Sequence, residues 1–252
     1  MTVKDFGDLT AFNSISVSGN IVVTYILEEV PSNSVTATGK QSVVKKVSAS
    51  VVDSCLYIKS THKGTEEAEL VDVAIISGDF GIKRIDTAKR GQFIFAGEFD
   101  TDNISIKMDG LGYVGMSGTM SCDTLSINIT EEGVLLLPNV VSAHTYIEVE
   151  KGGDAEIANL DTKSARVYIN NGGYVGLKGF ADEAVMHSVG KGDIMAWGFK
   201  VKDLILILKG LGVINCYATE SVTVDKMEST YNSYINVSGN PKKRYIMGEE
   251  AE

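Results

Sequence analysis

The sequence predicts an all-β protein folded as a right-handed parallel β-helix, a solenoid with coils of about 20 residues. The first observation is a set of regularly spaced glycines: Gly91, Gly112, Gly133, Gly153, Gly173, Gly192 and Gly212. The gaps between them are 21, 21, 20, 20, 19 and 20 residues. A fixed period of this size is typical of a solenoid, and it is too short for a propeller blade of about 40–45 residues.

The second observation is an alternation of apolar and polar residues around each of these marker glycines. Apolar residues stand eight, six and four positions before the last marker, at Leu204, Leu206 and Leu208, and two and four positions after it, at Ile214 and Cys216. Residues two apart share one face of a strand, so these positions are predicted to point inward. A shorter third segment of each coil is predicted to supply a further inward residue from this set: Phe99, Val140, Leu160, Phe180 and Phe199.

Three parts are expected along the chain. Residues 1–70 lack the clean repeat and are predicted to form an N-terminal β cap with first strands packed on the solenoid. The physical reason is that an open solenoid end exposes core residues and unpaired strand edges. Residues 71–241 are predicted to form the parallel β-helix, and residues 242–252 a mobile tail.

Composition excludes several classes of function. The 252 residues carry a formal net charge of −10, which argues against binding to nucleic acids or anionic membranes. Three cysteines are too few for a disulfide framework, and the longest purely apolar run, 204–208, is far shorter than a transmembrane segment. His62, His144 and His187 lie far apart in the sequence, so no metal site and no cofactor are expected.

Both ends of the repeat carry motifs that resemble a known family. Phe12-Asn-Ser-Ile-Ser-Val-Ser-Gly-Asn-Ile-Val-Val opens the pattern, Gly-x-apolar coils fill the middle, and Tyr234-Ile-Asn-Val-Ser-Gly-Asn-Pro241 closes it. Over about residues 6–241 the chain resembles the putative auto-transporter adhesin, head GIN domain family, which is found mainly in Bacteroidetes and was first classed as a domain of unknown function. The resemblance implies a β-helical protein exported to the cell surface or the periplasm, although no secretory signal opens this chain. It brings no catalytic residues.

One outward column is a candidate ligand-binding surface. The positions five residues after the marker glycines include Lys178, Trp197 and Tyr217 on successive coils, and Met195 lies on the same face two residues before Trp197. An exposed aromatic ladder can bind sugar rings or a protein partner. The alternative is that other parts of the chain or a second subunit cover this patch.

A second outward column is a candidate for self-association. It contains Tyr168, His187 and Ile207, and Ile205 stands two residues before Ile207. Apolar side chains on an outer wall are predicted to be covered by a second copy, which makes a homo-oligomer one expectation.

The function predicted from these features is a non-enzymatic adhesin or interaction module that binds a host or cell-surface protein or glycan. One alternative is a polysaccharide-active β-helix enzyme, because such enzymes need clustered outward carboxylates. Asp154 and Asp193 share a column two coils apart, roughly 10 Å at the spacing of strands. No catalytic constellation stands out beyond this pair. The other alternative is a structural envelope protein that associates with itself.

Overall fold

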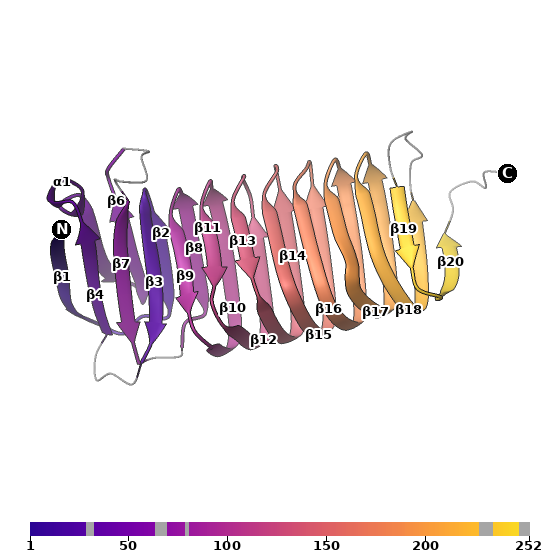
Figure 1. The fold of residues 1–252 in the computed structure, drawn as a ribbon, viewed down its shortest axis with the longest axis horizontal. Coiled ribbons are helices and arrows are strands. Elements are labelled where there is room, and N and C mark those ends of the chain that lie inside the picture. The colour runs from indigo at the N-terminus through magenta and orange to yellow at the C-terminus, as the bar shows by residue number, and fades with distance from the viewer. Residues whose placement is uncertain (29–32, 64–69, 79–80, 227–233, 247–252) are drawn as a thin grey trace.

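The computed structural model describes residues 1–28, 33–63, 70–78, 81–226 and 234–246, and these residues wind into an all-β solenoid (Figure 1). The strands before the regular coils are β1 (Thr2–Leu9), β2 (Ser14–Ser18), β3 (Ile21–Leu27), β4 (Asn33–Gly39), β5 (Val47–Val52), β6 (Cys55–Ser60) and β7 (Val71–Ser77). A short helix, α1 (Gln41–Val44), lies between β4 and β5. The described residues contain no helix with the length and apolar composition needed to cross a membrane.

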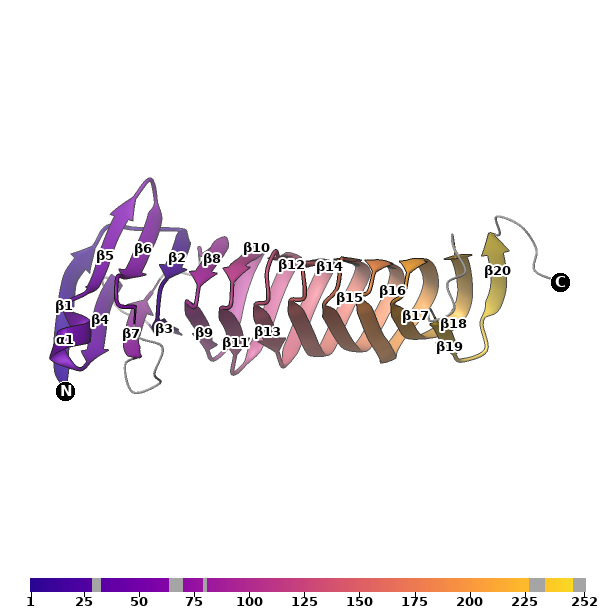
Figure 2. The same cartoon turned by 90° about the horizontal axis from the view of Figure 1, so that it is seen from above.

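The regular coils follow as a stack of strands along one axis (Figures 1 and 2). They are β8 (Arg84–Lys89), β9 (Gln92–Ala96), β10 (Phe99–Gly110), β11 (Tyr113–Met116), β12 (Thr119–Ile129), β13 (Val134–Leu137), β14 (Asn139–Glu150), β15 (Asp154–Asn170), β16 (Tyr174–Gly190), β17 (Asp193–Gly210), β18 (Val213–Lys226), β19 (Tyr234–Ser238) and β20 (Lys242–Ile246). Every pairing from β8 onward is parallel. The predicted solenoid with coils of about 20 residues is confirmed.

Neighbouring coils pair equivalent positions of successive repeats. Val167 pairs with Met186, Met186 pairs with Leu206, and Leu206 pairs with Val224. These side chains point inward, and Leu206 is fully buried. The alternation of apolar and polar residues therefore becomes a continuous interior that all coils share.

The marker glycines sit at corners where successive coils approach closely. The backbone N–H of Val134 donates to the Gly112 carbonyl at 3.0 Å, and that of Asp193 donates to the Gly173 carbonyl at 3.0 Å. A Cβ atom added at Gly112 would lie 2.5 Å from the Gly91 carbonyl oxygen of the preceding coil. Glycine is required at this corner because any side chain would push the stacked backbones apart.

Several polar side chains that enter the core find partners inside it, whereas the buried Thr87 Oγ1 has no hydrogen-bond partner among the described residues. Ser142 Oγ lies 2.7 Å from Thr145 Oγ1 and donates to Thr162 Oγ1 at 3.0 Å, so three inward hydroxyls satisfy one another across two coils. Ser188 Oγ donates to the Gly192 carbonyl at 2.6 Å. These bonds remove the penalty of burying the hydroxyl groups.

The N-terminal strands do not stack in chain order. Val23 of β3 pairs with Val73 of β7 on one side and with Phe93 of β9 on the other, and β2 lies in the same way between β6 and β8. Tyr25 joins an aromatic cluster in this coil, with its ring centroid 6.3 Å from that of Phe93 and 6.2 Å from that of Phe99. Residues 14–27 thus form a parallel coil inside the stack.

Antiparallel strands close the N-terminal end of the solenoid. The strand β4 pairs antiparallel with β1 and with β7, and β5 pairs antiparallel with β6. Figure 2 shows the β5–β6 hairpin projecting sideways from the stack. The first 70 residues therefore supply both an antiparallel end and one parallel coil.

Two details differ from the sequence-based expectations. Phe180 is 36% exposed rather than inward, since it pairs with Asp161 and Lys200 in an outward column while Ala181 is buried. The strand β20 occupies the start of the segment predicted to be a mobile tail, and it pairs with the otherwise open edge of β18; residues 247–252 lie outside the described residues.

The inward assignment can be tested at adjacent positions of β17. Leu206→Asp buries an unpaired charge, so we expect it to lower the free energy of unfolding by at least about 4 kcal/mol. Ile205→Asp is the matched control, because Ile205 is 44% exposed on the opposite face of the same strand. Thermal unfolding followed by circular dichroism measures both. Equal melting temperatures for Leu206→Asp and the parent would contradict the inward position.

Candidate functional site

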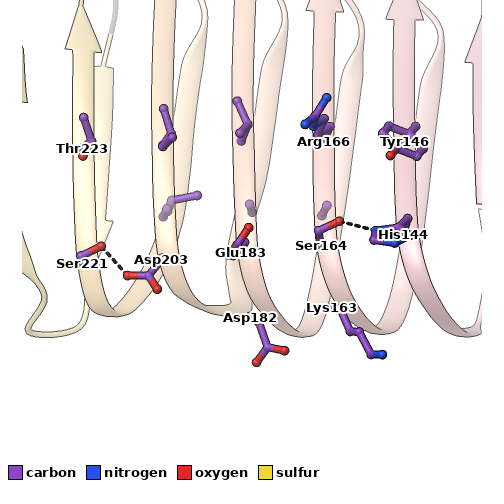
Figure 3. A pocket seen from close by; sticks show the side chains of 15 residues that line it. His144, Tyr146, Lys163, Ser164, Arg166, Asp182, Glu183, Asp203, Ser221 and Thr223 are labelled. Atoms are coloured by element: carbon purple, nitrogen blue, oxygen red, sulfur yellow. Dashed lines mark hydrogen bonds between the residues drawn. The ribbon is translucent and has the colours of Figure 1, made fainter.

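A groove of about 750 Å³ runs along the outer face of β14 to β18. Two rows of residues at matching register line it (Figure 3). The first row is His144, Ser164, Glu183, Asp203 and Ser221. The second row is Tyr146, Arg166, Val185, Ile205 and Thr223. Each row crosses five successive strands, so the groove exists only because the coils stack.

Strand alternation points both rows outward. Between them lies an inward row that anchors the wall in the core, formed by Thr145, Ala165, Ala184, Leu204 and Val222, all at most 3% exposed. Because the period of a strand is two residues, the positions on either side of this row face solvent. The groove residues are therefore held at the strand spacing of about 4.8 Å along the solenoid.

Contacts between neighbouring coils order the first row. His144 Nδ1 lies 2.8 Å from Ser164 Oγ, and Ser221 Oγ donates to Asp203 Oδ1 at 2.5 Å. Figure 3 shows both contacts along the wall of the groove. These hydrogen bonds hold polar groups in line and leave their remaining donor and acceptor positions on the surface.

Charge is divided along the groove. Lys163 and Arg166 contribute positive charge over β15, whereas Asp182, Glu183 and Asp203 contribute negative charge over β16 and β17. The Arg166 guanidinium carbon lies 5.9 Å from the centroid of the Tyr146 ring, within range of a cation–π contact. A ligand lying along the groove therefore meets a cationic aromatic end and an acidic end.

An ion pair links the acidic end to the next coil. Lys202 Nζ donates to Asp182 Oδ1 at 2.6 Å, and this hydrogen bond, together with the negative charge of Asp182, raises the pKa of Lys202. Glu183 and Asp203 occupy adjacent coils of the first row, at register-matched positions. The acidic end thus keeps two register-matched carboxylates on the groove wall.

Apolar surface lies among these polar groups. Tyr146 is 39% exposed and Ile205 is 44% exposed, although both stand on a wall of paired strands. An aromatic face beside hydrogen-bonding groups is the combination that sugar rings and extended polar chains use for binding. The groove is therefore a candidate binding site.

The structure places the predicted ladder of Lys178, Trp197 and Tyr217 on another wall and out of register. Trp197 is 70% exposed. However, Lys178 pairs with Gly198, and Tyr217 pairs with Lys200. Both pairings show a register shift at this point. Relative to β16, the strand β17 has one additional residue between Met195 and Gly198. Relative to β18, residues 197–199 of β17 fall between the consecutive pairs Ala196–Cys216 and Lys200–Tyr217. Trp197 therefore does not stand opposite Tyr217.

Met195 lies near the start of the same strand and has a polar contact. It is half-buried, and Asn215 Nδ2 donates to Met195 Sδ at 2.9 Å. Met195 pairs with Gly176 on one side and Asn215 on the other. Met195, two residues before Trp197, is thus bonded to an amide of the next coil.

The second predicted column is in register. Tyr168 pairs with His187, and His187 pairs with Ile207. The rings of Tyr168 and His187 meet edge to face with their centroids 5.0 Å apart. Ile205 lies one column away, in the second row of the groove. The structure thus brings Tyr168, His187 and Ile207 together beside the groove.

His187 is the unusual member of this column. Its Nε2 atom is buried and has no hydrogen-bond partner among the described residues. Burial lowers the pKa of His187, the charge of Lys209 lowers it further, and Asp225 partly opposes them. The neutral imidazole is therefore favoured in the folded protein.

The two candidate catalytic carboxylates are separated by a tyrosine. Tyr174 pairs with Asp154 on one side and with Asp193 on the other. Asp193 Oδ1 accepts a hydrogen bond from the backbone N–H of Val213 at 2.9 Å, while burial raises the pKa of Asp154. At other corners the equivalent backbone N–H donates to a glycine carbonyl, as Val134 does to Gly112. At this corner the Asp193 side chain accepts that hydrogen bond instead.

The three histidines occupy separate places. His62 Nδ1 lies 3.2 Å from Lys46 Nζ near the N-terminal end, His144 lines the groove, and His187 contacts Tyr168. Among the described residues, no three His, Cys, Asp or Glu side chains form a group that could hold a metal ion.

Most groove residues were not singled out in the sequence, although Ile205 was. The missing signal is the pair of outward columns nine and seven positions before the marker glycines, where His144, Tyr146, Arg166 and Asp203 stand. Reading these columns across coils shows polar and aromatic residues gathering on β14 to β18.

The sequence and the fold match known proteins over nearly the whole chain. A family described as "Putative auto-transporter adhesin, head GIN domain" matches residues 11–144 and 138–241. The fold is similar to that of a putative adhesin from Parabacteroides merdae ATCC 43184, with a TM-score of 0.68 and 18% identity over 97% of this chain and 92% of that chain. No curated protein matches this sequence.

Two structures from Parabacteroides distasonis ATCC 8503 share the fold. One is described as a putative lipid binding protein, with a TM-score of 0.70 and 16% identity over 97% of this chain and 92% of that chain. The other is a putative adhesin, with a TM-score of 0.63 and 20% identity over 97% of this chain and 93% of that chain. At these identities the likeness shows the shared architecture.

The lowered pKa of His187 predicts a dependence of stability on pH. The unfolded chain binds a proton near the ordinary value of 6.5, whereas the folded protein binds it only at lower pH. Stability from neutral His187 is therefore fully present above pH 6.5 and is lost as the pH falls through the folded-state pKa. His187→Phe keeps the ring contact with Tyr168, so urea unfolding should show a smaller acid-induced loss of stability for the variant. The same loss in variant and parent would contradict the assignment.

Proposed function

The chain belongs to the putative auto-transporter adhesin, head GIN domain family, and from this we propose that it is a non-enzymatic interaction module that binds a glycan through the groove on β14 to β18. The family name implies an exported or surface protein. We place the protein at the cell surface or in the periplasm, where a solenoid can present its side wall to a partner.

The observation that carries the proposal is the pair of matched rows in the groove. The rows offer the exposed ring of Tyr146 beside Arg166, and the carboxylate of Asp203 with its hydrogen bond from Ser221. Sugar hydroxyls both donate and accept hydrogen bonds, so they match a surface that carries cations, hydroxyls and carboxylates. The repeat of the rows along the solenoid suits an extended chain.

Recognition in this groove needs no movement of the backbone. All five strands belong to one hydrogen-bonded sheet, and the inward row beneath the groove is buried. A preformed site loses little conformational entropy when it binds, which helps a shallow groove to reach useful affinity. Binding of many copies on one surface would add avidity.

The proposal is tested by binding the purified protein to an array of glycans and extracellular-matrix proteins. Tyr146→Ala/Arg166→Ala removes the exposed ring and the cation beside it, so we expect at least about tenfold weaker glycan binding. Trp197→Ala/Tyr217→Ala is the comparison, because it alters the other wall and leaves the groove intact.

Each pattern of results separates the alternatives. Loss of glycan binding only in the groove variant supports the proposal. Loss only in the Trp197 variant would move the site to the other wall, and binding to matrix proteins alone would replace the glycan with a protein partner. Turnover of an acidic polysaccharide that Asp154→Asn or Asp193→Asn abolishes would show an enzyme instead.

Self-association is a second candidate function, favoured by the exposure of Ile205. This side chain is 44% exposed and stands beside the column of Tyr168, His187 and Ile207. We expect Ile205→Lys to weaken an oligomer held by this wall, with Leu211→Lys as the control because Leu211 is 42% exposed in a turn. Light scattering over a range of concentrations measures the mass. A strict monomer at high concentration would contradict self-association.

A further inference from the structure

A second hollow, of about 650 Å³, lies where the turns after β2, β6, β8 and β10 meet near the N-terminal end. Four basic side chains line it: Lys59, Lys63, Lys89 and Arg90. None of the described residues that line it is an aspartate or a glutamate, although the chain as a whole carries 33 acidic and 23 basic residues. The described lining of the hollow is thus basic, whereas the chain as a whole is acidic.

Strand register brings these basic residues together from distant parts of the sequence. Ser18 of β2 pairs with Lys59 on one side and with Ala88 on the other, and Lys89 pairs with Gly110. The strands therefore follow one another in space as β6, β2, β8 and β10. The basic residues meet only because β2 is inserted between β6 and β8.

The turn backbone fixes where Lys89 stands. Lys89 has a positive φ of 61°, and Gly110 of the next coil has a φ of 129°. A Cβ atom at Gly110 would lie 2.5 Å from the Lys89 carbonyl oxygen, so the two turns are in close contact. This contact places the start of the Lys89 side chain at the edge of the hollow, beside Arg90.

The hollow has further polar and cationic neighbours. His62 lines it, and Lys46 Nζ lies 3.2 Å from His62 Nδ1. Lys59 Nζ lies 4.8 Å from the centroid of the Tyr57 ring. Leu111, which is 53% exposed, supplies an apolar side. The hollow is thus lined largely by carbon surface, with basic residues among the residues that form it.

Two acidic residues on the neighbouring strands have partners of their own. Asp86 of β8 forms an ion pair with Arg84, whose Nε lies 2.9 Å from Asp86 Oδ2. Asp109 Oδ1 of β10 accepts a hydrogen bond from Thr130 Oγ1 at 3.3 Å. Neither residue lines the hollow. Residues 64–69, which carry Glu66, Glu67 and Glu69, lie outside the described residues, so the test uses the full chain.

We propose that this hollow is a binding site for a phosphate or sulfate ester group on a small soluble ligand. Basic side chains bind such groups through charge-assisted hydrogen bonds, and Arg90 can contact two of the oxygens at once. A compact anionic group can enter the hollow without contacting the rest of the protein surface. A flat anionic membrane would instead face the wider surface of a chain whose net charge is −10, and it would be repelled. The site is separate from the groove on β14 to β18 and does not depend on its function.

The test is a titration of the ¹⁵N-labelled full chain at low salt with inorganic phosphate, inorganic sulfate and glucose 6-phosphate. Glucose is the uncharged comparison. We expect saturable shifts of the amide signals of Gly19, Asn20, Lys89 and Gly110 with the anions and none with glucose. Added sodium chloride should weaken binding, because screening shortens the reach of the charges.

Variants with equal change in net charge locate the site. Lys89→Gln/Arg90→Gln removes two cations from the hollow and should weaken binding at least about tenfold. Lys83→Gln/Lys200→Gln removes two exposed cations elsewhere and should leave binding within about twofold of the parent. Circular dichroism should show that both proteins remain folded.

Three outcomes would overturn the proposal. The first is the absence of saturable binding by the full chain. The second is an equal loss in both variant pairs, which would show that only the overall charge acts. The third is binding to phosphatidylglycerol vesicles without binding to the soluble probes, which would assign the cluster to a membrane surface.

Discussion

The structure depends on the close contact between successive coils at the marker glycines. Each coil can place its backbone on the next only because these corners carry no side chain, as the contact of Gly112 with the Gly91 carbonyl shows. The hydrogen bonds at these corners, such as that from Val134 to Gly112, continue the sheet through the turn. Inward stacking, the outward columns and both hollows follow from this spacing. A corner that held a larger residue would separate the columns as well as the coils.

Much of the solenoid could be predicted from the sequence because the patterns that specify it lie within short stretches of the chain. The alternation around Leu206 is visible within a few residues, and the glycine period repeats it along the chain. The position of β2 and β3 was not predictable in this way. Val23 satisfies the same alternation whether it stands at the end of the stack or between β7 and β9, and only long-range pairing decides. The position of Phe180 was missed because a register shift in its coil turned the residue outward.

In the candidate site, too, some features can be seen in a short stretch of sequence and others depend on the pairing of distant strands. Ile205 was recognisable as an outward apolar residue, but its neighbours Tyr146 and Arg166 gain meaning only when the coils are aligned. Trp197 leaves the column of Tyr217 because residues 197–199 of β17 fall between two consecutive pairs with β18. Residues on successive coils share a column only where the strands have equal lengths between their pairs. The basic hollow depends on the inserted coil of β2 and β3. It therefore has no signal in the sequence at all.

The insertion of β2 and β3 also sets the order in which this protein can fold. Both neighbours of this coil are made later than the coil itself, since β6 and β7 end at Ser77 and β8 and β9 end at Ala96. In a growing chain, one edge of residues 14–27 therefore waits for β6 and β7, and the other edge waits for β8 and β9. In a regular solenoid the end coil can be deleted and the rest stays stacked. Here the loss of β2 and β3 would separate β6 and β7 from β8 and β9, so an early segment of the chain joins the N-terminal strands to the regular coils.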